Sequence, residues 1–475
     1  MRYISTRGSA PVLEFEDVLL TGLARDGGLY VPESWPTISP DELRALRGAS
    51  YVDIATRVML PFLGDSIDAA TFRALVADSY SGFGSQAVTP LIQLDHRLWL
   101  MELFHGPTLA FKDVALQLLG RLFDFFLKRR NRRVCVVGAT SGDTGSAAIE
   151  ACRDRDAIDI FILHPHGRTS EVQQRQMTTV LSPNVRNIAV RGTFDDCQDL
   201  VKAMFNDAAF RDQHQLSAVN SINWARIMAQ TAYYVAAAVA LGAPDRPIAF
   251  SVPTGNFGNV YAAYCARAMG APIERLIIGA NSNDILARFF QSGTMTPNTV
   301  TPTVSPSMDI QISSNFERLL FDLYQREAGF LTECMQRFRV QGSFSVTPTQ
   351  LDMARALFSS TRVGEDETRA AIAQTWRNNA QIIDPHTAVG VAAARAAIAA
   401  EDVPPQTALV ALACAHPAKF PAVVEEATGV HPPLPPRLAD LLQRPERLEI
   451  LPNDLNAVQS YIRQELAGRA SRGTA

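Results

Sequence analysis

The sequence predicts an α/β protein built on parallel β-sheets. Short apolar runs of strand length alternate with helical patterns, and this alternation is typical of parallel strands joined by helices. Two of these runs end in glycine-rich loops that lead directly into helices of small residues. The chain has 475 residues, which is enough for two or three domains with a large buried core.

Composition and charge narrow the classes of function. Hydrophobic residues make up 47% of the chain and charged residues 19%, and the net charge is −4, so nothing favours a nucleic-acid partner. The one basic run, residues 128–133, fits a helix C-terminus, where positive charge is favourable. The N-terminus lacks the apolar core of a signal peptide, and we interpret the longest uncharged run, 227–244, as a buried helix and not a membrane span. The six cysteines are widely spaced without a Cys-x-x-Cys pair, which indicates a reduced, cytoplasmic protein.

Residues 1–100 are predicted to form an N-terminal unit. Asp26-Gly27-Gly28 is a tight turn between apolar segments. Ser39 and Pro40 form a good helix start, with Ser39 as the N-cap and Pro40 at the first helical position. This unit contains no catalytic motif, and we expect it to form a cap over the α/β units.

The next unit, residues 101–215, carries the first candidate functional residue, Lys112. Lys112 follows Leu109, Ala110 and Phe111 and precedes another apolar run, so we expect it to be partly buried. Burial disfavours the ammonium form, which makes the amine available as a nucleophile or proton acceptor. An isolated lysine of this kind is more often a surface residue near a helix start. Only four lysines stand among the 44 lysines and arginines, however, which favours amine chemistry for this one.

Strands and helices alternate through the rest of this unit. A strand at 134–137 leads into the glycine-rich loop 138–145 and a helix of small residues. This layout points backbone N–H groups at an anion. Further strands are predicted at 158–163 and 186–190, with helices beginning at Ser170 and Asp195.

The third unit, residues 216–430, repeats the pattern. Its first helix opens at 221–226, and its strand at 248–252 leads into a second glycine loop, 253–259, and another helix. A loop rich in Thr, Pro and Ser comes next, then a helical insertion at about 300–380. The remaining predicted elements are a strand at 275–280, a helix capped by Asp384, a last strand at 407–413, and a proline-rich linker and tail at 431–475.

Three other kinds of site fit less well. A P-loop needs Gly-Lys followed by Ser or Thr, and no lysine in this chain follows a glycine. The spacing of Gly138, Gly142 and Gly145 comes close to that of a nicotinamide-dependent short-chain reductase. That class also needs a tyrosine four residues before a lysine, which this chain lacks, and no acidic residue follows the next strand. His164 and His166 have no evident third ligand, so we expect no metal site.

Several stretches, in order along the chain, resemble threonine synthases of the longer bacterial and fungal type. The resemblance runs from residue 1 to about residue 429 and leaves only the C-terminal tail outside. The opening residues 1–8 and the stretch 26–32 also fit it. The stretches that carry it are Leu103–Asp113, Ala139–Gly145, Ser221–Asn223, Pro253–Gly258 and Ala415–Phe420.

This resemblance implies a fold-type-II pyridoxal-phosphate enzyme of the tryptophan-synthase-β-like kind, with two three-layer α/β domains plus an N-terminal cap unit. It implies conversion of O-phospho-L-homoserine and water into L-threonine and phosphate, the last step of threonine biosynthesis. We expect a cytoplasmic monomer or homodimer that binds neither nucleic acid nor membrane. The alternatives are another enzyme of this fold, such as a serine or threonine dehydratase, or a catalytically silent binding homologue.

The resemblance also assigns roles to residues. Lys112 matches the lysine that forms the Schiff base with pyridoxal 5'-phosphate and shuttles protons. The second glycine loop resembles the cofactor-phosphate cup, and the first resembles the substrate-carboxylate site, with Asp143 near the cofactor ring. The expected cofactor-binding residues are Lys112, Asp143, Gly255, Asn256, Phe257, Gly258, Asn259 and Cys414. The expected substrate-binding residues are Thr140, Ser141, Gly142, Asp143, Thr144, Ser221, Asn223, Arg226 and Lys419, of which the last four are proposed for the substrate phosphate.

Cys414 is one departure from the family pattern. Relatives carry Thr before the Ala-His-Pro-Ala-Lys-Phe stretch, where this chain has Cys414. In this fold a hydroxyl near that position is expected to hydrogen-bond the pyridine nitrogen, and a thiol is a weaker donor. Cys414 therefore makes a weaker contact, or another group takes its place, or the replacement is neutral.

Overall fold

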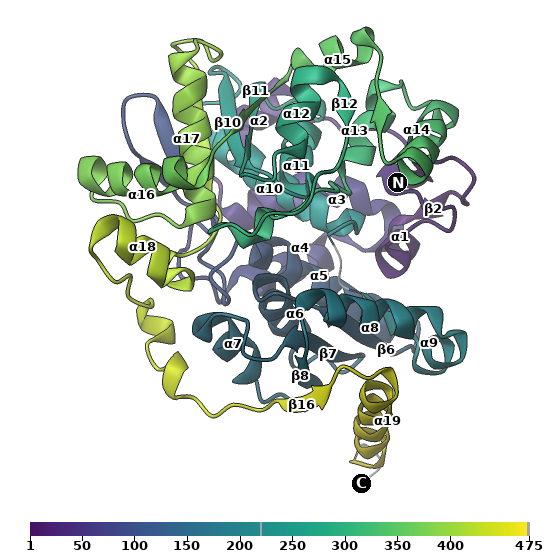
Figure 1. Ribbon diagram of the computed structural model, residues 1–475. Coiled ribbons are helices and arrows are strands. Elements are labelled where there is room, and N and C mark those ends of the chain that lie inside the picture. Colours follow the sequence, from purple (N-terminus) through teal and green to yellow (C-terminus); the bar gives the residue numbers. More distant parts are fainter. Residues whose placement is uncertain (219–220, 473–475) are drawn as a thin grey trace. The chain divides into compact units, whose positions relative to one another are not determined.

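The computed structural model describes residues 1–218 and 221–472. The chain divides into two compact units, each assembled from two separate segments (Figure 1). Unit 1 comprises Met1–Ala115 and Ser221–Pro433, and unit 2 comprises Leu116–Asn220 and Leu434–Ala475. Residues 219–220 of the predicted third unit and residues 473–475 of the predicted tail lie outside the described residues.

This division differs from the predicted domain boundaries. The predicted N-terminal unit does not stand alone, because its residues 91–93 and 98–102 supply two strands of the main sheet of unit 1. Lys112 also falls in unit 1, since the segment before it is hydrogen-bonded to the loop near Cys414. The predicted tail joins unit 2, because Glu449–Pro452 pairs there as a sheet strand.

Unit 1 is organised around a six-stranded sheet with strand order β14-β11-β10-β15-β5-β4. All neighbouring strands run parallel except the edge pair β4 and β5, so the prediction of a parallel sheet is confirmed for the core of the unit. The central strands are buried along their whole length, as expected when both faces are covered. The strands are β4 (Leu91–Gln93), β5 (Leu98–Glu102), β10 (Ile248–Pro253), β11 (Ile273–Ala280), β14 (Phe358–Arg362) and β15 (Ala408–Ala413).

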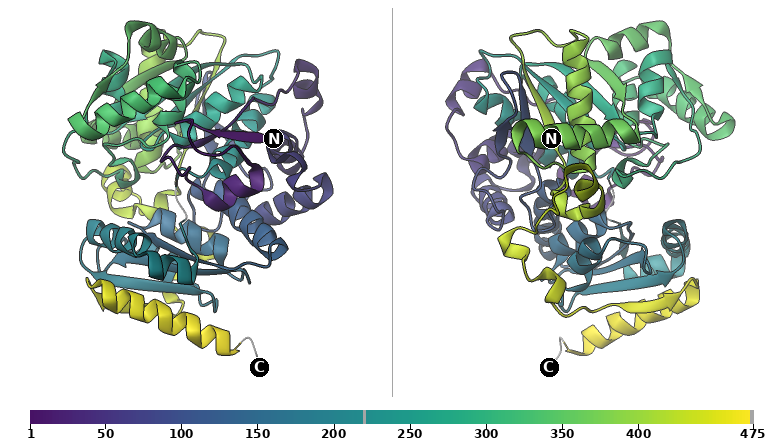
Figure 2. Two further views of the ribbon diagram at one scale, coloured as in Figure 1. Left: turned by 90° about the vertical axis from the view of Figure 1, so that its right-hand side faces the viewer. Right: turned by 60° about the vertical axis from the view of Figure 1, so that its left-hand side comes forward.

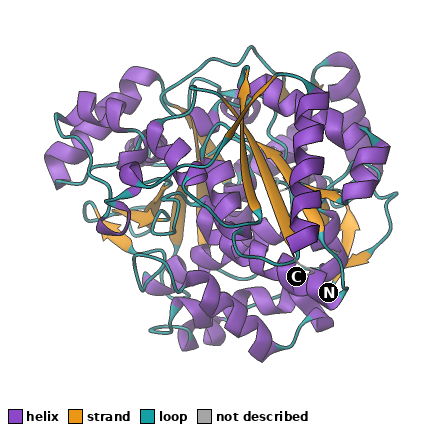
Figure 3. Ribbon diagram, turned by 90° about the horizontal axis from the view of Figure 1, so that it is seen from below, coloured by secondary structure: helices purple, strands orange, loops and turns teal. Residues whose placement is uncertain are grey.

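Helices cover both faces of this sheet and make three layers (Figure 3). One face packs on α16, α17 and α18 through alanine, valine and leucine side chains. The other face packs on α10 and α11, where the rings of Tyr234 and Phe250 meet edge to face at 4.8 Å. The helices are α10 (Trp224–Ala240), α11 (Gly258–Ala268), α16 (Glu365–Asn379), α17 (Pro385–Ala399) and α18 (Pro421–Thr428).

The N-terminal hundred residues add a small sheet and four helices to unit 1. Ser39 caps α2 in a capping box with Glu42, and Pro40 is its first residue, as predicted. Helix α3 packs on α10 and so ties this segment to the main sheet. The elements are β1 (Arg2–Ser5), β2 (Leu13–Glu14), α1 (Phe15–Thr21), β3 (Tyr30–Pro32), α2 (Pro40–Ala45), α3 (Tyr51–Leu63) and α4 (Ala69–Tyr80).

The predicted helical insertion is present but also contains strands. Strand β14 lies within it and forms the edge of the main sheet, which the sequence patterns did not predict. A short antiparallel pair joins β12 (Thr294–Met295) to β13 (Phe344–Ser345). The other elements of this region are α12 (Ile285–Ser292), α13 (Phe316–Leu323), α14 (Ala328–Gln341) and α15 (Pro348–Arg355).

Unit 2 has a five-stranded parallel sheet with strand order β16-β8-β7-β6-β9. One face packs on α8, α9 and α19, while α6 packs against β7 and α7 packs against α6. The C-terminal helix α19 lies beside this unit in both views of Figure 2, with Val458 and Ile462 fully buried. The strands are β6 (Val134–Ala139), β7 (Ile158–Pro165), β8 (Val185–Arg191), β9 (Leu216–Ser217) and β16 (Glu449–Pro452). The helices are α5 (Lys112–Arg129), whose first turn belongs to unit 1, α6 (Asp143–Cys152), α7 (Glu171–Thr178), α8 (Phe194–Asn206), α9 (Ala208–His214) and α19 (Leu455–Arg472).

Helix caps agree with most of the predicted starts. Ser170 caps α7 and Asp384 caps α17 through their side chains. Helix α8 starts one residue earlier than predicted, because Thr193 forms a capping box with Asp196. The basic run 128–133 begins in the last turn of α5, which confirms it as a helix C-terminus. Among the described helices, none combines the length and the apolarity that crossing a membrane requires.

Candidate active site

Lys112 stands at the start of α5 on a segment that is hydrogen-bonded to the loop after β15. Phe111 N–H donates to the carbonyl of Cys414 at 2.7 Å, and His416 N–H donates to the carbonyl of Leu109 at 3.0 Å. Leu109 adopts a left-handed φ of 62°, which turns the chain into the helix. The Lys112 side chain is buried, with the residue only 7% exposed, so the expectation of a buried lysine is confirmed.

The turn before Lys112 is built around the buried carboxylate of Asp113. Asp113 accepts hydrogen bonds from the backbone N–H of Thr108 at 2.8 Å and from its hydroxyl at 2.6 Å. Gly106 is required here, because a Cβ at that position would lie 2.3 Å from the Cβ of Asp113. Lys419 is fully buried, and its ammonium donates to the carbonyl of Thr108 at 2.7 Å. Lys419 therefore has a structural partner in this turn.

Ser307 connects Lys112 to a buried histidine–aspartate pair. Lys112 Nζ lies 3.4 Å from Ser307 Oγ. The backbone N–H of Ser307 donates to His386 Nε2 at 3.2 Å, and His386 Nδ1 lies 2.7 Å from the Asp384 carboxylate. Because Nε2 accepts, the ring proton belongs on Nδ1 and is donated to Asp384. All four residues are in unit 1, and Asp384 and His386 are 0% and 3% exposed.

The second glycine loop, after β10, approaches the same serine. A Cβ on Gly255 would lie 3.4 Å from the carbonyl oxygen of Ser307 and 3.2 Å from the Cα of Met308, so the two segments are in close backbone contact. Phe257 caps α11 with a left-handed φ of 62° and is buried. The carbonyl of Asn256 accepts from both the backbone N–H and the side chain of Asn315. The loop is thus held from both sides, with the first N–H groups of α11 at its end.

Asn259 presents a buried donor that no described residue satisfies. Its carbonyl oxygen accepts from the hydroxyl of Tyr233, in a short contact, and from the hydroxyl of Tyr234 at 2.7 Å. These two bonds fix the orientation of the amide. Its Nδ2 group is buried without a hydrogen-bond partner in the described part of the protein. A buried unpaired donor is costly, so its position indicates a ligand acceptor.

One face of α10 carries two more unpaired polar groups. Arg226 Nε and Gln230 Oε1 are buried without a partner among the described residues, and the two residues are four apart on the helix. Burial lowers the pKa of the Arg226 guanidinium to about 10, so the group stays cationic at neutral pH. Arg226 also lies within electrostatic range of Tyr233 and hence of the Asn259 end of the loop.

Three other predicted ligand residues, Ser221, Asn223 and Cys414, have structural partners. Asn223 is the N-cap of α10, accepting from Ala225 N–H at 3.0 Å and donating to the carbonyl of Leu19 at 2.9 Å. The Ser221 carbonyl accepts from Asn315 at 3.2 Å. Cys414 is buried, with its backbone N–H on the hydroxyl of Thr387 at 2.9 Å and its thiol 3.8 Å from the carbonyl of Leu412. Their predicted ligand roles stay untested predictions.

Unit 2 holds the first glycine loop, at the N-terminus of α6. The hydroxyl oxygen of Thr140 accepts from the backbone N–H groups of Gly142 and Gly145, both at 2.9 Å. Gly142 has a φ of 148°, and a Cβ there would lie 2.5 Å from the side chain of Gln173. Gln173 also donates to the buried Asp143 carboxylate at 2.9 Å. The loop therefore leads into a helix N-terminus, as predicted, and two of its N–H groups are bonded to Thr140; anion binding by the others stays a prediction.

The structure brings most of the predicted unit 1 residues into one region and adds others. Ser307 lies between Lys112 and the Gly255 end of the second glycine loop, and Tyr233 and Tyr234 hold Asn259 at the other end of that loop. Lys419 has the partner described above. The sequence patterns missed five residues, because a lone serine, histidine or tyrosine carries no motif. They are Ser307, His386, Tyr233, Tyr234 and Gln230. Across the described residues, no group of His, Cys, Asp and Glu side chains has metal-binding geometry.

Three family models together match most of the chain. "Threonine synthase N terminus" matches residues 2–80, "Pyridoxal-phosphate dependent enzyme" matches residues 83–337, and "Threonine synthase, C-terminal" matches residues 387–462. The central model covers both glycine loops and Lys112, and the C-terminal model covers Cys414 and Lys419.

Similar proteins are alike along their entire length. Threonine synthase of Pseudomonas aeruginosa is 54% identical over 465 residues, covering 98% of both chains. The crystal structure of threonine synthase from Brucella melitensis with bound pyridoxal phosphate superimposes with a TM-score of 0.96, at 53% identity over 98% of this chain and 99% of that one. The yeast threonine synthase structure gives a TM-score of 0.94 at 41% identity, with the same coverage.

Proposed function

The chain belongs to the threonine synthase family, and we propose that Lys112 and the loop Gly255–Asn259 form its cofactor centre. The protein is a pyridoxal-phosphate-dependent lyase of threonine biosynthesis. We propose O-phospho-L-homoserine as the substrate. In that reaction one Cβ–H bond and the Cγ–O bond to phosphate break, the hydroxyl of water is added at Cβ, and a proton is added at Cγ.

Residues of unit 1 fit pyridoxal phosphate. The buried Lys112 amine suits a covalent link to the cofactor aldehyde, and the N-terminus of α11 suits its phosphate. The buried, unpaired Nδ2 of Asn259 needs an acceptor, and the cofactor has several. This orphaned donor, in the loop whose first glycine lies against the Lys112 neighbour Ser307, is the observation that carries the proposal. When bound, the cofactor supplies a conjugated electron sink that makes the substrate Cα–H acidic.

Lys112 is the group that we propose moves protons at the substrate carbons. Its amine would accept the protons that leave Cα and Cβ, and it would return one at Cγ and finally one at Cα. Ser307 Oγ, at 3.4 Å, orients the amine. Asp384 and His386 act as positioning residues, because they fix the backbone of Ser307 through the bond from its N–H to Nε2.

Arg226 is our proposed ligand for the substrate phosphate. Its guanidinium is buried and cationic, and it has no carboxylate partner among the described residues. A buried charge of this kind is stable only with an anion beside it, and a phosphate ester supplies one. We assign the unpaired amide oxygen of Gln230 to a donor on the ligand. Lys419 is better described as a support of the Thr108 turn, because its ammonium bonds to that carbonyl.

For unit 2 we propose that the loop Thr140–Thr144 binds the substrate carboxylate. The first N–H groups of α6 have no partners inside the helix, and a carboxylate suits that end. The role of Asp143 near the cofactor ring stays part of this proposal. We further propose that the enzyme works in the cytoplasm as a monomer or homodimer, where its six free cysteines would stay reduced.

The test is the reaction itself. Wild type should release equimolar phosphate and threonine from O-phospho-L-homoserine, and Lys112→Ala should release neither. Borohydride reduction and then mass spectrometry should show the cofactor attached to the Lys112 peptide of wild type only. Ammonia and an oxo acid from serine or threonine, without turnover of phosphohomoserine, would contradict the proposal and indicate a dehydratase. A cofactor attached to another lysine would refute the assignment of Lys112.

A further inference from the structure

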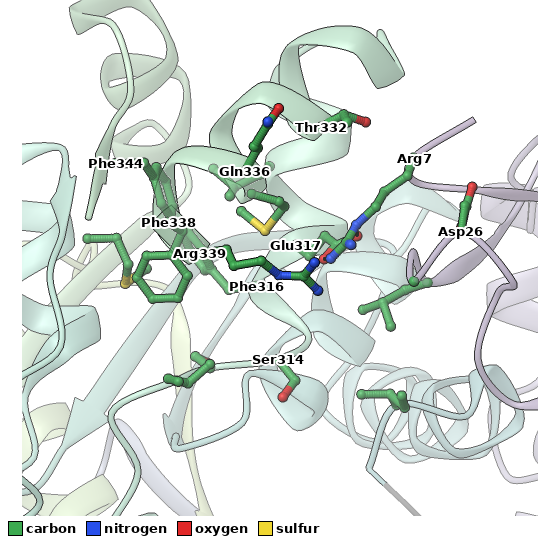
Figure 4. Close-up of a pocket in the computed structure, with 18 of the residues that line it drawn as sticks. Arg7, Asp26, Ser314, Phe316, Glu317, Thr332, Gln336, Phe338, Arg339 and Phe344 are labelled. Carbon is green, nitrogen blue, oxygen red and sulfur yellow. Dashed lines mark hydrogen bonds and ion pairs between the residues drawn. The ribbon is translucent and has the colours of Figure 1, made fainter. Parts of the chain in front are cut away.

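Unit 1 contains a cavity of about 770 Å³ that is lined by none of the residues assigned to the cofactor or the substrate (Figure 4). Its walls come from the N-terminal segment, from the start of α13 and from α14. The volume is in the range of small-molecule sites. The turn at Asp26 and Gly27, which the sequence singled out without a function, lines this cavity.

Both carboxylates of the cavity are already satisfied inside the protein. Glu317 receives two hydrogen bonds from Arg7, at 3.0 and 3.2 Å, and one from Thr6 at 2.6 Å. Asp26 accepts from the hydroxyl of Ser5 at 2.8 Å and from three backbone N–H groups at 2.8 to 3.0 Å. Neither acid is therefore available as the main anchor of a cationic ligand.

Arg339 is the charged group of the cavity that lacks a partner among the described residues. It stands in the last turn of α14 and forms neither an ion pair nor a hydrogen bond with any residue that the structure describes. In Figure 4 its guanidinium reaches into the cavity beside Phe316 and toward Glu317. A guanidinium so placed attracts an anion, and a planar carboxylate matches its geometry.

Much of the rest of the lining is apolar, at both the floor and the rim, although Ser313, Ser314, Thr332 and Gln336 also line the cavity. Phe316 and Phe344 are buried at the floor, at 2% and 5% exposure. Ile312, Val340 and Leu23 are 61%, 75% and 43% exposed, and all three line the same cavity. Large apolar side chains gathered in the open around a hollow are typical of a binding site.

We propose that this cavity binds a small organic carboxylate with an apolar or aromatic body. The carboxylate pairs with Arg339, and the body lies against Phe316 and the apolar rim. Because both carboxylates accept hydrogen bonds from within the protein and Arg339 has no described partner, the charge pattern favours an anionic occupant over a cationic one. A single arginine also suits one carboxylate better than the phosphate groups of the substrate and the cofactor.

The cavity shares a wall with the loop that we assign to the cofactor. The hydroxyl of Ser313 donates to the carbonyl of Gly255 at 2.7 Å, and the ring of Phe316 meets that of Phe257 edge to face at 5.0 Å. A ligand that fixes this wall also changes the affinity of the loop for its own ligand, and the effect is reciprocal. This coupling rests on the proposed role of the loop, whereas binding in the cavity does not.

The experiment compares three probes of one shape and different charge on the full-length holoenzyme. Phenylacetate, 2-phenylethanol and phenethylamine are titrated by calorimetry, with saturation-transfer NMR for weak binding. We expect saturable binding of phenylacetate at one site, weaker binding of the alcohol and the weakest binding of the amine. Equal affinity for acid and amine, or no saturable binding of phenylacetate, would overturn the proposal.

Variants locate the site. Arg339→Gln should weaken phenylacetate about tenfold, as expected for loss of a charge-assisted bond. The matched control is Arg337→Gln on the same helix. It removes the same charge, but Arg337 pairs with Glu333 and neither residue lines the cavity. This control should leave the affinity for phenylacetate unchanged. Thr332→Trp, at an exposed position of the lining, should block binding by filling the mouth. Equal effects of the two arginine variants, or normal binding to Thr332→Trp, would contradict the assignment.

The coupling is measured separately, as the affinity of pyridoxal phosphate with and without saturating phenylacetate. A changed affinity in wild type and in Arg337→Gln, but not in Arg339→Gln, supports it. Phenylacetate binding without any change in cofactor affinity would refute the coupling and leave the cavity site standing. Turnover of phosphohomoserine by Arg339→Gln should match wild type in the absence of phenylacetate.

Discussion

Arg226→Met should make the free protein more stable while it removes substrate binding. The guanidinium of Arg226 has a pKa of about 10 in the folded protein against an ordinary value of 12.5. The difference of about 2.5 units corresponds to about 3 kcal/mol of unfavourable burial. Methionine keeps much of the apolar stem and carries no charge, so most of this cost disappears. The free energy of unfolding of the cofactor-free protein should therefore rise by about 3 kcal/mol.

Arg318→Met is the matched control, and its sign should be opposite. Arg318 is also fully buried, with a pKa lowered by burial to about 10. It differs from Arg226 in its hydrogen bonds, which go to the carbonyls of Tyr30 and Ile222 and to the side chain of Asn315. Charge-assisted bonds contribute about 1.5–3 kcal/mol each, so four of them outweigh a burial cost of about 3 kcal/mol. This variant should lose at least about 3 kcal/mol.

Urea unfolding monitored by circular dichroism at neutral pH measures both variants. The pH dependence of stability follows from the lowered pKa of Arg226. Below pH 10 the guanidinium is protonated in both the folded and the unfolded protein, so its burial cost is present in full. It declines as pH rises above 10, because the folded protein releases this proton first. In parallel, Arg226→Met should lower kcat/KM for phosphohomoserine about 100-fold, the equivalent of about 3 kcal/mol. An Arg226→Met variant that is less stable than wild type, or that retains the wild-type KM, would refute the proposal that this guanidinium binds the substrate phosphate.

Three further predictions concern the rest of the site. Ser307→Ala should lower kcat about tenfold with cofactor content unchanged, because it removes the hydroxyl that orients the lysine amine. An unchanged kcat in steady-state assays would show that Ser307 has no role in catalysis. Tyr234→Phe removes one of the donors to the amide oxygen of Asn259. It should lower the affinity for pyridoxal phosphate about threefold to tenfold in fluorescence titrations. An unaltered affinity would show that other contacts set the orientation of this amide. Gly142→Ala should lower the free energy of unfolding by about 1–3 kcal/mol and raise KM, because the φ of 148° at this position excludes a side chain. The control is Gly329→Ala, where a Cβ meets nothing within 4 Å, and it should be neutral.

Local patterns predicted many of the elements and both glycine loops of this protein correctly. Alternating apolar runs predicted strands β6, β7, β8, β10, β11 and β15, and the side chains of Ser39, Ser170 and Asp384 cap the helices that they were expected to begin. These features depend on neighbours within a few residues, so the sequence contains their whole cause. The burial of Lys112 could be predicted in the same way, because apolar residues flank it on both sides in the sequence.

The partners of the site residues depended on tertiary structure alone. Ser307 reaches Lys112 across 195 residues, and its backbone bonds to His386 across 79. The ammonium of Lys419, a predicted substrate ligand, likewise donates to a carbonyl 311 residues away, a partner that its motif did not indicate. A local sequence pattern does not indicate which distant groups the sheet and its covering helices bring within hydrogen-bonding distance. The family and the candidate nucleophile could thus be predicted from the sequence, whereas the surroundings of that lysine were decided by packing between segments far apart in the chain.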